Sequence, residues 1–278
     1  MAIDAAAATV MITTYNRLNL TKKTFETTLK NAGCKYNLII VDNASMDGTV
    51  EWLNSNLKTF DLQNYHVAPL NKNMGIAYGR NLGLKICDEH FPDTDFLCTL
   101  DNDVVLPDNW LIRCCNVLKS MDKIVACGIN LEDRQYPKTK LRLINGEYET
   151  IQIKPLGNLG TAAMVFSAAS RNRLGFFENY ECYGHEDALW GFRLRQISGG
   201  NLTYLEEPGI HLGVEAEDSG EYRQMKNKYW DINMKKFERD IRLYANGIKP
   251  LYAKFENYDK SLEKDVLIRG RTYAPNQS

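Results

Sequence analysis

The residues best suited to chemistry are two carboxylates, Asp101 and Asp103, which follow an apolar run near the middle of the chain. Residues 96–100 predict a buried strand, and Asn102 separates the two acids. Because side chains alternate along an extended chain, both carboxylates are expected to point the same way. In an open α/β sheet, ligands bind beyond the carboxyl ends of the strands. The pair therefore predicts a divalent-cation site that would hold a diphosphate; the alternative is an ordinary turn, which Asp and Asn also favour.

Polar residues also follow the first two predicted strands, at residues 8–14 and 37–41. The first strand leads into residues 13–17, and the second leads into Asp42 and the polar stretch 42–47. Carboxyl ends of neighbouring parallel strands meet at one edge, so these groups are expected beside the acidic pair. There, Asp42 would accept a hydrogen bond from a base N–H or from ribose hydroxyls, or it would simply cap the next segment.

A loop rich in Asn and Gly, residues 71–75, precedes a predicted helix at 76–88 that has Arg80 one turn inside it. Backbone N–H groups at a helix start and a nearby cation together suit a nucleotide diphosphate. The alternative is that Gly79 and Gly83 only allow close helix packing. The stretch is neither the six-position glycine fingerprint of dinucleotide-binding folds nor a P-loop.

Two further candidates lie in the second half of the chain. Glu186 and Asp187 stand at the start of a predicted helix at 187–197, where the helix dipole favours a charged carboxylate. An ionised Asp187 facing the cation would serve as a general base, although a plain helix cap fits the same pattern. His211 lies in a tight loop past the next predicted strand. It would complete a cation site together with Asp103; the alternative is that this histidine has no role in the site.

Strands and helices alternate through the first half of the chain. These elements position the candidate site residues. This alternation predicts an α/β fold whose parallel sheet is covered on both faces. The strands are expected at 8–14, 37–41, 65–68, 96–100 and 124–128, and the helices at 18–32, 49–56, 76–88 and 109–121.

The second half is more irregular. Asn145-Gly146 between two β-rich runs predicts a hairpin, and residues 222–244 predict a long helix that would cover the sheet or support a homodimer. The polar tail after Pro250 is expected to be loosely ordered. The remaining expected elements are an apolar run at 160–166, helices at 167–174 and 187–197, a strand at 202–205 and a loop at 206–213.

Composition limits the class of protein. The 278 residues suffice for one large domain or two small ones, and 44% hydrophobic with 25% charged residues is typical of globular proteins. A net charge of −1 predicts neither nucleic-acid nor anionic-membrane binding. No apolar run approaches the roughly 18 residues of a membrane span, and the start lacks a signal-peptide pattern. The seven cysteines lack metal-ligand spacing, which indicates reduced core residues in a cytoplasmic protein.

Taken in order, these motifs resemble family 2 glycosyltransferases of the GT-A fold. The resemblance spans about residues 8–213 and implies a Rossmann-like, mostly parallel sheet flanked by helices, with a smaller acceptor-side β-region and a C-terminal helical extension. It divides the chain into a nucleotide-sugar-binding half at 1–130, an acceptor-binding half at 131–213 and the extension at 214–278. The stretches that carry it are 11–17, 40–49, 73–81, the acidic triplet 101–103 and 184–187.

The resemblance implies transfer of a sugar from a nucleoside-diphosphate sugar, with a UDP-sugar as the expected donor and Mn²⁺ or Mg²⁺ as the cofactor. The acceptor would be a glycan or another molecule with a hydroxyl group. Asp187 would be the base of an inverting reaction, and Glu186 would contact the acceptor. Asp103 and His211 would bind the metal, and Asp101 would touch the metal or the ribose. The nucleotide would be held by Thr13, Tyr15, Asn16, Arg17, Asp42, Asn73, Gly75, Arg80, Asp101 and Asn102, with Thr13, Tyr15 and Asp42 at the base.

Three alternatives remain open. A retaining glycosyltransferase of the same fold would use Asp187 to orient the acceptor. A nucleotide-sugar nucleotidyltransferase would carry a Gly-rich basic loop after the first strand, where this chain has Thr-Tyr-Asn-Arg at 14–17. A non-catalytic sugar-binding module would lack the nucleotide site. Two departures from the family pattern are Asn102, in the middle of the triplet, and Leu189, where many members keep another acid.

The segments expected to select the acceptor, residues 132–158, 178–184 and the C-terminal part, contain no recognisable motif. Tyr180 and Tyr183 would stack on a sugar ring or pack in the core. A nucleic-acid acceptor is not favoured, because the sequence has no basic stripe.

Overall fold

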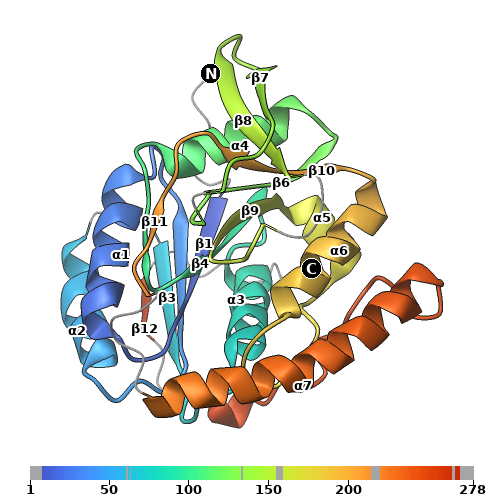
Figure 1. Ribbon diagram of the computed structural model, residues 1–278. Coiled ribbons are helices and arrows are strands. Elements are labelled where there is room, and N and C mark those ends of the chain that lie inside the picture. The colour runs from blue at the N-terminus through green and yellow to red at the C-terminus, as the bar shows by residue number, and fades with distance from the viewer. Residues whose placement is uncertain are drawn as a thin grey trace, which may run out of the picture.

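A ten-stranded sheet runs through the protein, with helices on both of its faces (Figure 1). The structure is a computed structural model that describes residues 8–60, 62, 64–132, 134–154, 159–213, 220–264 and 267–269. The strand order is β12-β3-β2-β1-β4-β9-β6-β10-β8-β7. This architecture confirms the predicted α/β fold with helices flanking a largely parallel central sheet.

The first half of the chain forms the parallel part of the sheet as predicted. Paired strands keep a regular register, in which Thr13 lies opposite both Val41 and Asp101. The carboxyl ends of three strands are thereby aligned at one edge. The strands are β1 (Ala8–Thr14), β2 (Asn37–Asp42), β3 (Asn64–Pro69) and β4 (Phe96–Asp101). The helices between them are α1 (Leu18–Asn31), α2 (Thr49–Asn56), the 3₁₀ turn η1 (Leu57–Thr59), α3 (Ile76–His90) and α4 (Trp110–Ser120).

Alternation of side chains along the strands divides the core into two layers. Val10 and Ile12 of β1 pack with Phe25 of α1, in a cluster that also includes residues of α2 and α4. Met11, between them in sequence, packs on the opposite face with Leu82 of α3 and with residues of the later helices. Because both faces of the sheet are covered, its central strands are apolar at nearly every position, which is why they read as continuous runs in the sequence.

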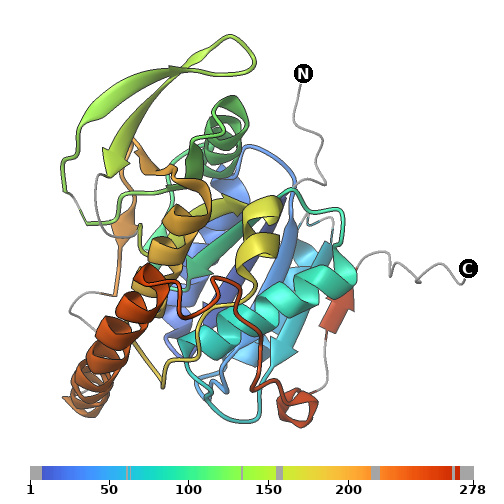
Figure 2. The same cartoon turned by 90° about the vertical axis from the view of Figure 1, so that its right-hand side faces the viewer.

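Every antiparallel pair among the described strands includes a strand from the second half of the chain. Strand β9 (Ala163–Ser167) lies between β4 and β6 (Ile124–Gly128) and is antiparallel to both. Strand β10 (Asn201–Leu205) is parallel to β6 and antiparallel to β8 (Tyr148–Lys154). With β7 (Lys138–Arg142), β8 forms the predicted hairpin, whose turn contains Gly146 at φ 90°. Figure 2 shows this hairpin projecting from the body of the protein.

The loop predicted at 206–213 contains a strand. Ile210–His211 (β11) pairs antiparallel with Val104–Val105 (β5), so His211 lies opposite Val104, the residue after Asp103. The sequence hides this pairing, because each strand is only two residues long and the partners are more than a hundred residues apart.

The remaining helices are α5 (Ala168–Leu174), α6 (Glu186–Ser198) and the long α7 (Gly220–Ala245). The tail was expected to be loosely ordered, but aromatic anchors fix its described part. Phe255 packs on Tyr78 of α3 with ring centroids 5.0 Å apart. After the 3₁₀ turn η2 (Lys260–Leu262), β12 (Leu267–Arg269) pairs with β3 at the edge of the sheet (Figure 2). The domain boundaries at 130 and 213 stay predictions.

Candidate active site

A cavity of about 460 Å³ lies at the carboxyl ends of β1 and β4. Pockets of this size commonly hold small-molecule ligands. Among the predicted site residues only Asn16 and Asp42 do not line it. The others that line it are Thr13, Tyr15, Arg17, Asn73, Gly75, Arg80, Asp101, Asn102, Asp103, Glu186, Asp187 and His211.

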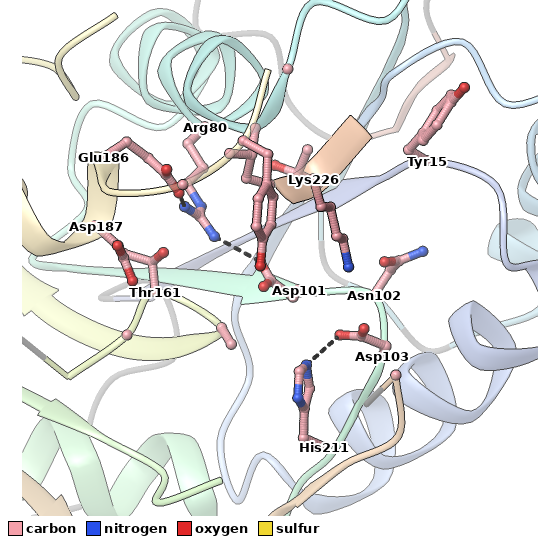
Figure 3. Close-up of a pocket in the computed structure, with 18 of the residues that line it drawn as sticks. Tyr15, Arg80, Asp101, Asn102, Asp103, Thr161, Glu186, Asp187, His211 and Lys226 are labelled. Atoms are coloured by element: carbon pink, nitrogen blue, oxygen red, sulfur yellow. Dashed lines mark hydrogen bonds and ion pairs between the residues drawn. The ribbon is translucent and has the colours of Figure 1, made fainter. Parts of the chain in front are cut away.

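Asp103 is held by two cationic or potentially cationic partners. Its Oδ2 accepts a hydrogen bond from Arg17 Nη1 at 2.8 Å, and its Oδ1 lies 3.3 Å from His211 Nε2 (Figure 3). Burial alone would raise the pKa of Asp103, but the hydrogen bond and charge of His211, together with Arg17, lower it overall. The same hydrogen bond raises the pKa of His211 against the effect of burial. Asp103 is therefore an anion with its two oxygens directed to different partners.

The two acids of the triplet do not share partners. Strand β4 ends at Asp101, and residues 102 and 103 form a turn, so the expected strand alternation does not continue to Asp103. Asp101 Oδ1 instead accepts a hydrogen bond from Arg80 Nη2 at 2.8 Å. Asn102 donates to the backbone oxygen of Asn16 at 3.2 Å and to Thr21 Oγ1 at 2.9 Å. The middle residue of the triplet thus ties the strand end to α1.

The distances around Asp103 bear on whether a divalent cation fits there. Two ligand atoms that bind one metal ion at right angles, each with a bond of about 2.1 Å, lie about 3.0 Å from each other. The distance between His211 Nε2 and Asp103 Oδ1 is 3.3 Å, close to this value. Asp101, the third predicted ligand, is engaged by Arg80. Among the residues that the structure describes, no group of three or more His, Cys, Asp or Glu side chains could hold a metal. Two protein ligands therefore fit, and the rest of the shell would come from water and phosphate oxygens.

Arg80 links three elements beneath the cavity. It is 4% exposed, and it donates to Glu186 Oε1 at 2.6 Å and to Asp101 Oδ1 at 2.8 Å (Figure 3). A buried cation needs such compensation, because a buried charge without a partner is strongly destabilising. Arg80 was predicted to bind the diphosphate, but in this structure both of its terminal nitrogens donate hydrogen bonds to carboxylates.

The adjacent acids at the start of α6 have different environments. Glu186 is 5% exposed; burial and the nearby charge of Asp187 raise its pKa to about 7, although Arg80 opposes the shift. Asp187 is only half-buried, lines the cavity and accepts a hydrogen bond from the backbone N–H of Ala188 at 2.6 Å. Figure 3 places Asp187 on the opposite side of the cavity from Asp103. Of the two acids, Asp187 is the one presented to a ligand.

Asp42 and Asn16 support the site from outside the cavity. Asp42 is fully buried, and its carboxylate accepts hydrogen bonds from the hydroxyls of Thr14 at 2.8 Å and Ser45 at 2.5 Å and from the Ser45 N–H at 2.9 Å. Asn16 accepts a hydrogen bond from Met46 N at 2.9 Å. In this conformation both residues crosslink the loops after β1 and β2, so their predicted contacts with the nucleotide stay predictions.

Asn43 lines the cavity in place of its neighbour Asp42, and the sequence reasoning missed this. Its amide donates to the Gly75 oxygen at 3.1 Å and accepts from Met74 N at 3.2 Å. The only signal available was its position directly after the strand end.

The first two N–H groups at the start of α3 have partners within the protein. Gly75 N donates to Asn73 Oδ1 at 2.9 Å, and Ile76 N donates to the Cys182 oxygen at 3.2 Å. Gly75 has φ 85°, and a Cβ there would lie 2.9 Å from the Cys182 backbone. In this structure the backbone of Cys182 makes the close approach that Gly75 allows, and the predicted contact of this loop with a nucleotide stays a prediction.

Residues 9–184 match the family model described as glycosyl transferase family 2, which is more than half of the chain. The chain belongs to this family. No curated protein sequence matched it. Glu186, Asp187 and His211 lie beyond the matched region, as does all of α7.

Solved structures support the GT-A fold of this family 2 chain. The mannosyltransferase PcManGT of Pyrobaculum calidifontis, in complex with GDP-Man and Mn²⁺, is 15% identical with TM-score 0.54, covering 78% of this chain and 59% of its own. S. aureus TarS is 16% identical with TM-score 0.54, covering 73% and 36%. GalNAc-T7 with UDP, GalNAc and Mn²⁺ is 12% identical with TM-score 0.55, covering 74% and 43%. The chain thus spans less than two thirds of each of these proteins.

Three side chains of α7 also line the cavity and were not predicted: Met225, Lys226 and Trp230. The sequence indicated that this family 2 chain has a long helix after the matched region, but a helical pattern does not reveal which cavity a helix borders. Within the ranges that the structure describes, no helix has the length and apolar character needed to cross a bilayer.

Proposed function

We propose that this chain transfers a sugar from a nucleoside-diphosphate sugar, in the first place a UDP-sugar, to an acceptor hydroxyl with inversion. One observation carries the proposal: a single cavity has the Asp103–His211 pair on one side and the half-buried Asp187 on the other. The nucleotide class is supported by the structural neighbours, which include complexes with GDP-Man, UDP and UDP-GlcNAc.

Asp103 and His211 would hold Mn²⁺ or Mg²⁺, in keeping with the Mn²⁺ present in two of the neighbours. When bound, such an ion neutralises charge on the departing diphosphate. Arg17, hydrogen-bonded to Asp103, adds a permanent positive charge at the same place. Carboxylate and water oxygens are suitable donors for both ions, an imidazole nitrogen suits Mg²⁺ less well, and a partly hydrated shell is usual for Mg²⁺.

Asp187 would act as the general base. As the acceptor oxygen forms its bond to the anomeric carbon, the bond from that carbon to the diphosphate oxygen breaks and the hydroxyl proton passes to Asp187. The N-terminus of α6 stabilises the ionised carboxylate. Glu186 is less suited to this role, because it is buried and ion-paired with Arg80. For inversion, base and leaving group must lie on opposite sides of the sugar, as Asp187 and Asp103 lie across the cavity.

The test begins with donor use and ends with stereochemistry. The purified protein is incubated with a panel of UDP- and GDP-sugars and Mn²⁺, and release of the nucleotide is followed by mass spectrometry. We expect turnover of at least one donor, and a thermal shift with UDP and Mn²⁺ that a sugar-binding module would lack. Proton NMR of the product anomer then decides the stereochemistry; a retained configuration would overturn the assignment of Asp187 as base.

A further inference from the structure

The cavity has an aromatic corner that the proposed chemistry does not use. Trp230 of α7 and Tyr183 of the preceding loop both line it, with ring centroids 6.4 Å apart and planes inclined at 37°. Trp230 is 44% exposed, which is unusual for a large aromatic side chain at the border of a cavity. The two residues come from different elements, so the fold brings them together.

Trp230 is fixed against the residues that precede the proposed base. Its ring centroid lies 4.1 Å from that of His185, and Phe237 stacks on His185 from farther along α7 at 5.4 Å. A Cβ on Gly184 would lie 3.0 Å from the Trp230 ring. Gly184 and His185 directly precede Glu186 and Asp187 in the chain. A ligand lying on the open part of the indole is therefore next to the start of α6.

Tyr183 is also held in place. The buried amide of Asn233 donates to the backbone oxygens of Glu181 at 2.7 Å and Tyr183 at 2.8 Å. The ammonium of Lys226 lies 5.1 Å from the Tyr183 ring centroid. Figure 3 shows Lys226 extending into the cavity. These contacts make the corner a preformed surface, which lowers the entropic cost of binding.

Tyr180, the other tyrosine of this loop, has a different role. It is 2% exposed, and its hydroxyl lies 3.4 Å from Asp240 of α7. Of the two tyrosines considered for stacking, the structure therefore leaves only Tyr183 in contact with the cavity.

We propose that Trp230 and Tyr183 form the acceptor subsite, and that the acceptor is a carbohydrate whose pyranose ring stacks on Trp230. A pyranose has an apolar C–H face surrounded by hydroxyls. The corner is complementary to it, since the indole lines the same cavity as the charged groups of Lys226 and Asp187. A lipid chain would instead need a continuous apolar wall. The inference rests on the proposed function, because it assigns the acceptor of that reaction.

Indole NMR signals test the inference without a known acceptor. The protein has four tryptophans, so ¹⁵N-tryptophan labelling gives few signals, and W230F assigns the signal of Trp230. The probes are methyl glycosides of glucose, galactose, mannose and N-acetylglucosamine. We expect at least one to shift the Trp230 signal saturably, while the buried Trp110 and Trp190 stay unchanged. Y183A should weaken that binding by up to about tenfold.

W52F is the matched control, because Trp52 lies on α2 against Phe25 and does not line the cavity. Binding of the glycoside should persist in W52F and be lost in W230A. If no glycoside moves the Trp230 signal, or if W230A binds the glycoside normally, the acceptor subsite is wrong.

A parallel titration with UDP and Mn²⁺ separates the two proposals. If UDP binds and the glycosides do not, only the inference on the acceptor fails. If the glycosides bind at Trp230 and UDP does not, the subsite stands as a carbohydrate site and the proposed transferase function fails. Folding of W230A is checked by its thermal midpoint.

Discussion

The two sides of the cavity are built differently. The side with Asp103, Arg17 and His211 lies at the ends of paired strands, and its carboxylate is held by Arg17 at 2.8 Å and by His211 at 3.3 Å. The side with Asp187 and Trp230 comes from two helices, and it leaves a half-buried carboxylate and a 44% exposed indole facing the cavity. The first side is suited to charge neutralisation, and the second to recognition of an uncharged ligand.

Replacement of the base should have the largest effect. D187N keeps the size of the side chain and its hydrogen bond with Ala188 N but removes the proton acceptor. Transfer is expected to fall by about 10²- to 10⁴-fold, the usual contribution of a general base. Affinity for UDP with Mn²⁺, measured by calorimetry, should stay within about twofold, because Asp187 lies on the other side of the cavity. Undiminished turnover of D187N would contradict the assignment.

Replacement of Asp103, the proposed metal ligand, should weaken nucleotide binding on the side of the cavity opposite Asp187. D103A is expected to weaken binding of UDP in the presence of Mn²⁺ by about 10- to 100-fold, since loss of a ligand and of an anion both disfavour the cation. Calorimetry with and without Mn²⁺ measures the difference. D108N, which alters an exposed carboxylate in the same segment, is the control. Equal affinity of D103A and the unmodified chain would exclude Asp103 as a ligand.

The sequence predicts the first side better than the second because the two depend on different distances along the chain. Parallel strands align their carboxyl ends by a regular register, so Thr13 and Asp101 are brought together by local patterns alone. Trp230, on the second side, reaches the cavity through packing of α7 on residues 184 and 185. This long-range contact leaves no periodic pattern in the sequence.

Even at the strand ends, residue type did not determine the direction of a side chain. Asp42, whose contact with the base stays a prediction, is fully buried and hydrogen-bonded to Thr14 and Ser45, whereas Asn43 lines the cavity. A one-residue difference in position reverses the face on which a side chain lies at the end of a strand. That choice depends on which neighbouring groups satisfy the carboxylate, and the sequence does not reveal these partners.

Glu186 provides a test through pH. Its pKa is raised from the usual 4.5 to about 7, so the folded state holds a proton that the unfolded state has released between these values. The free energy of unfolding should therefore fall as pH rises from about 4.5 to 7, by on the order of 1–3 kcal/mol, and level off above that range. E186Q should flatten this part of the profile in urea titrations. An unchanged slope in E186Q would show that other groups cause the pH dependence.

The smallest effect concerns the packing of α3 on the first side of the cavity. A Cβ at Gly79 would lie 2.6 Å from Thr13 Cγ2, whereas a Cβ at Gly83 would lie 3.4 Å from Met11, an ordinary contact. G79A should destabilise the protein by about 1–3 kcal/mol, because either the helix or Thr13 must move. G83A should be neutral or stabilising by up to about 1 kcal/mol, since alanine favours the helix.

Urea unfolding of both variants measures this difference, and UDP binding shows whether the shift reaches Thr13 and the cavity. Because G79A moves a residue at the end of β1, it should weaken UDP binding more than G83A does. If the two variants have equal stability, the close approach of α3 to β1 is not the reason for a glycine at position 79.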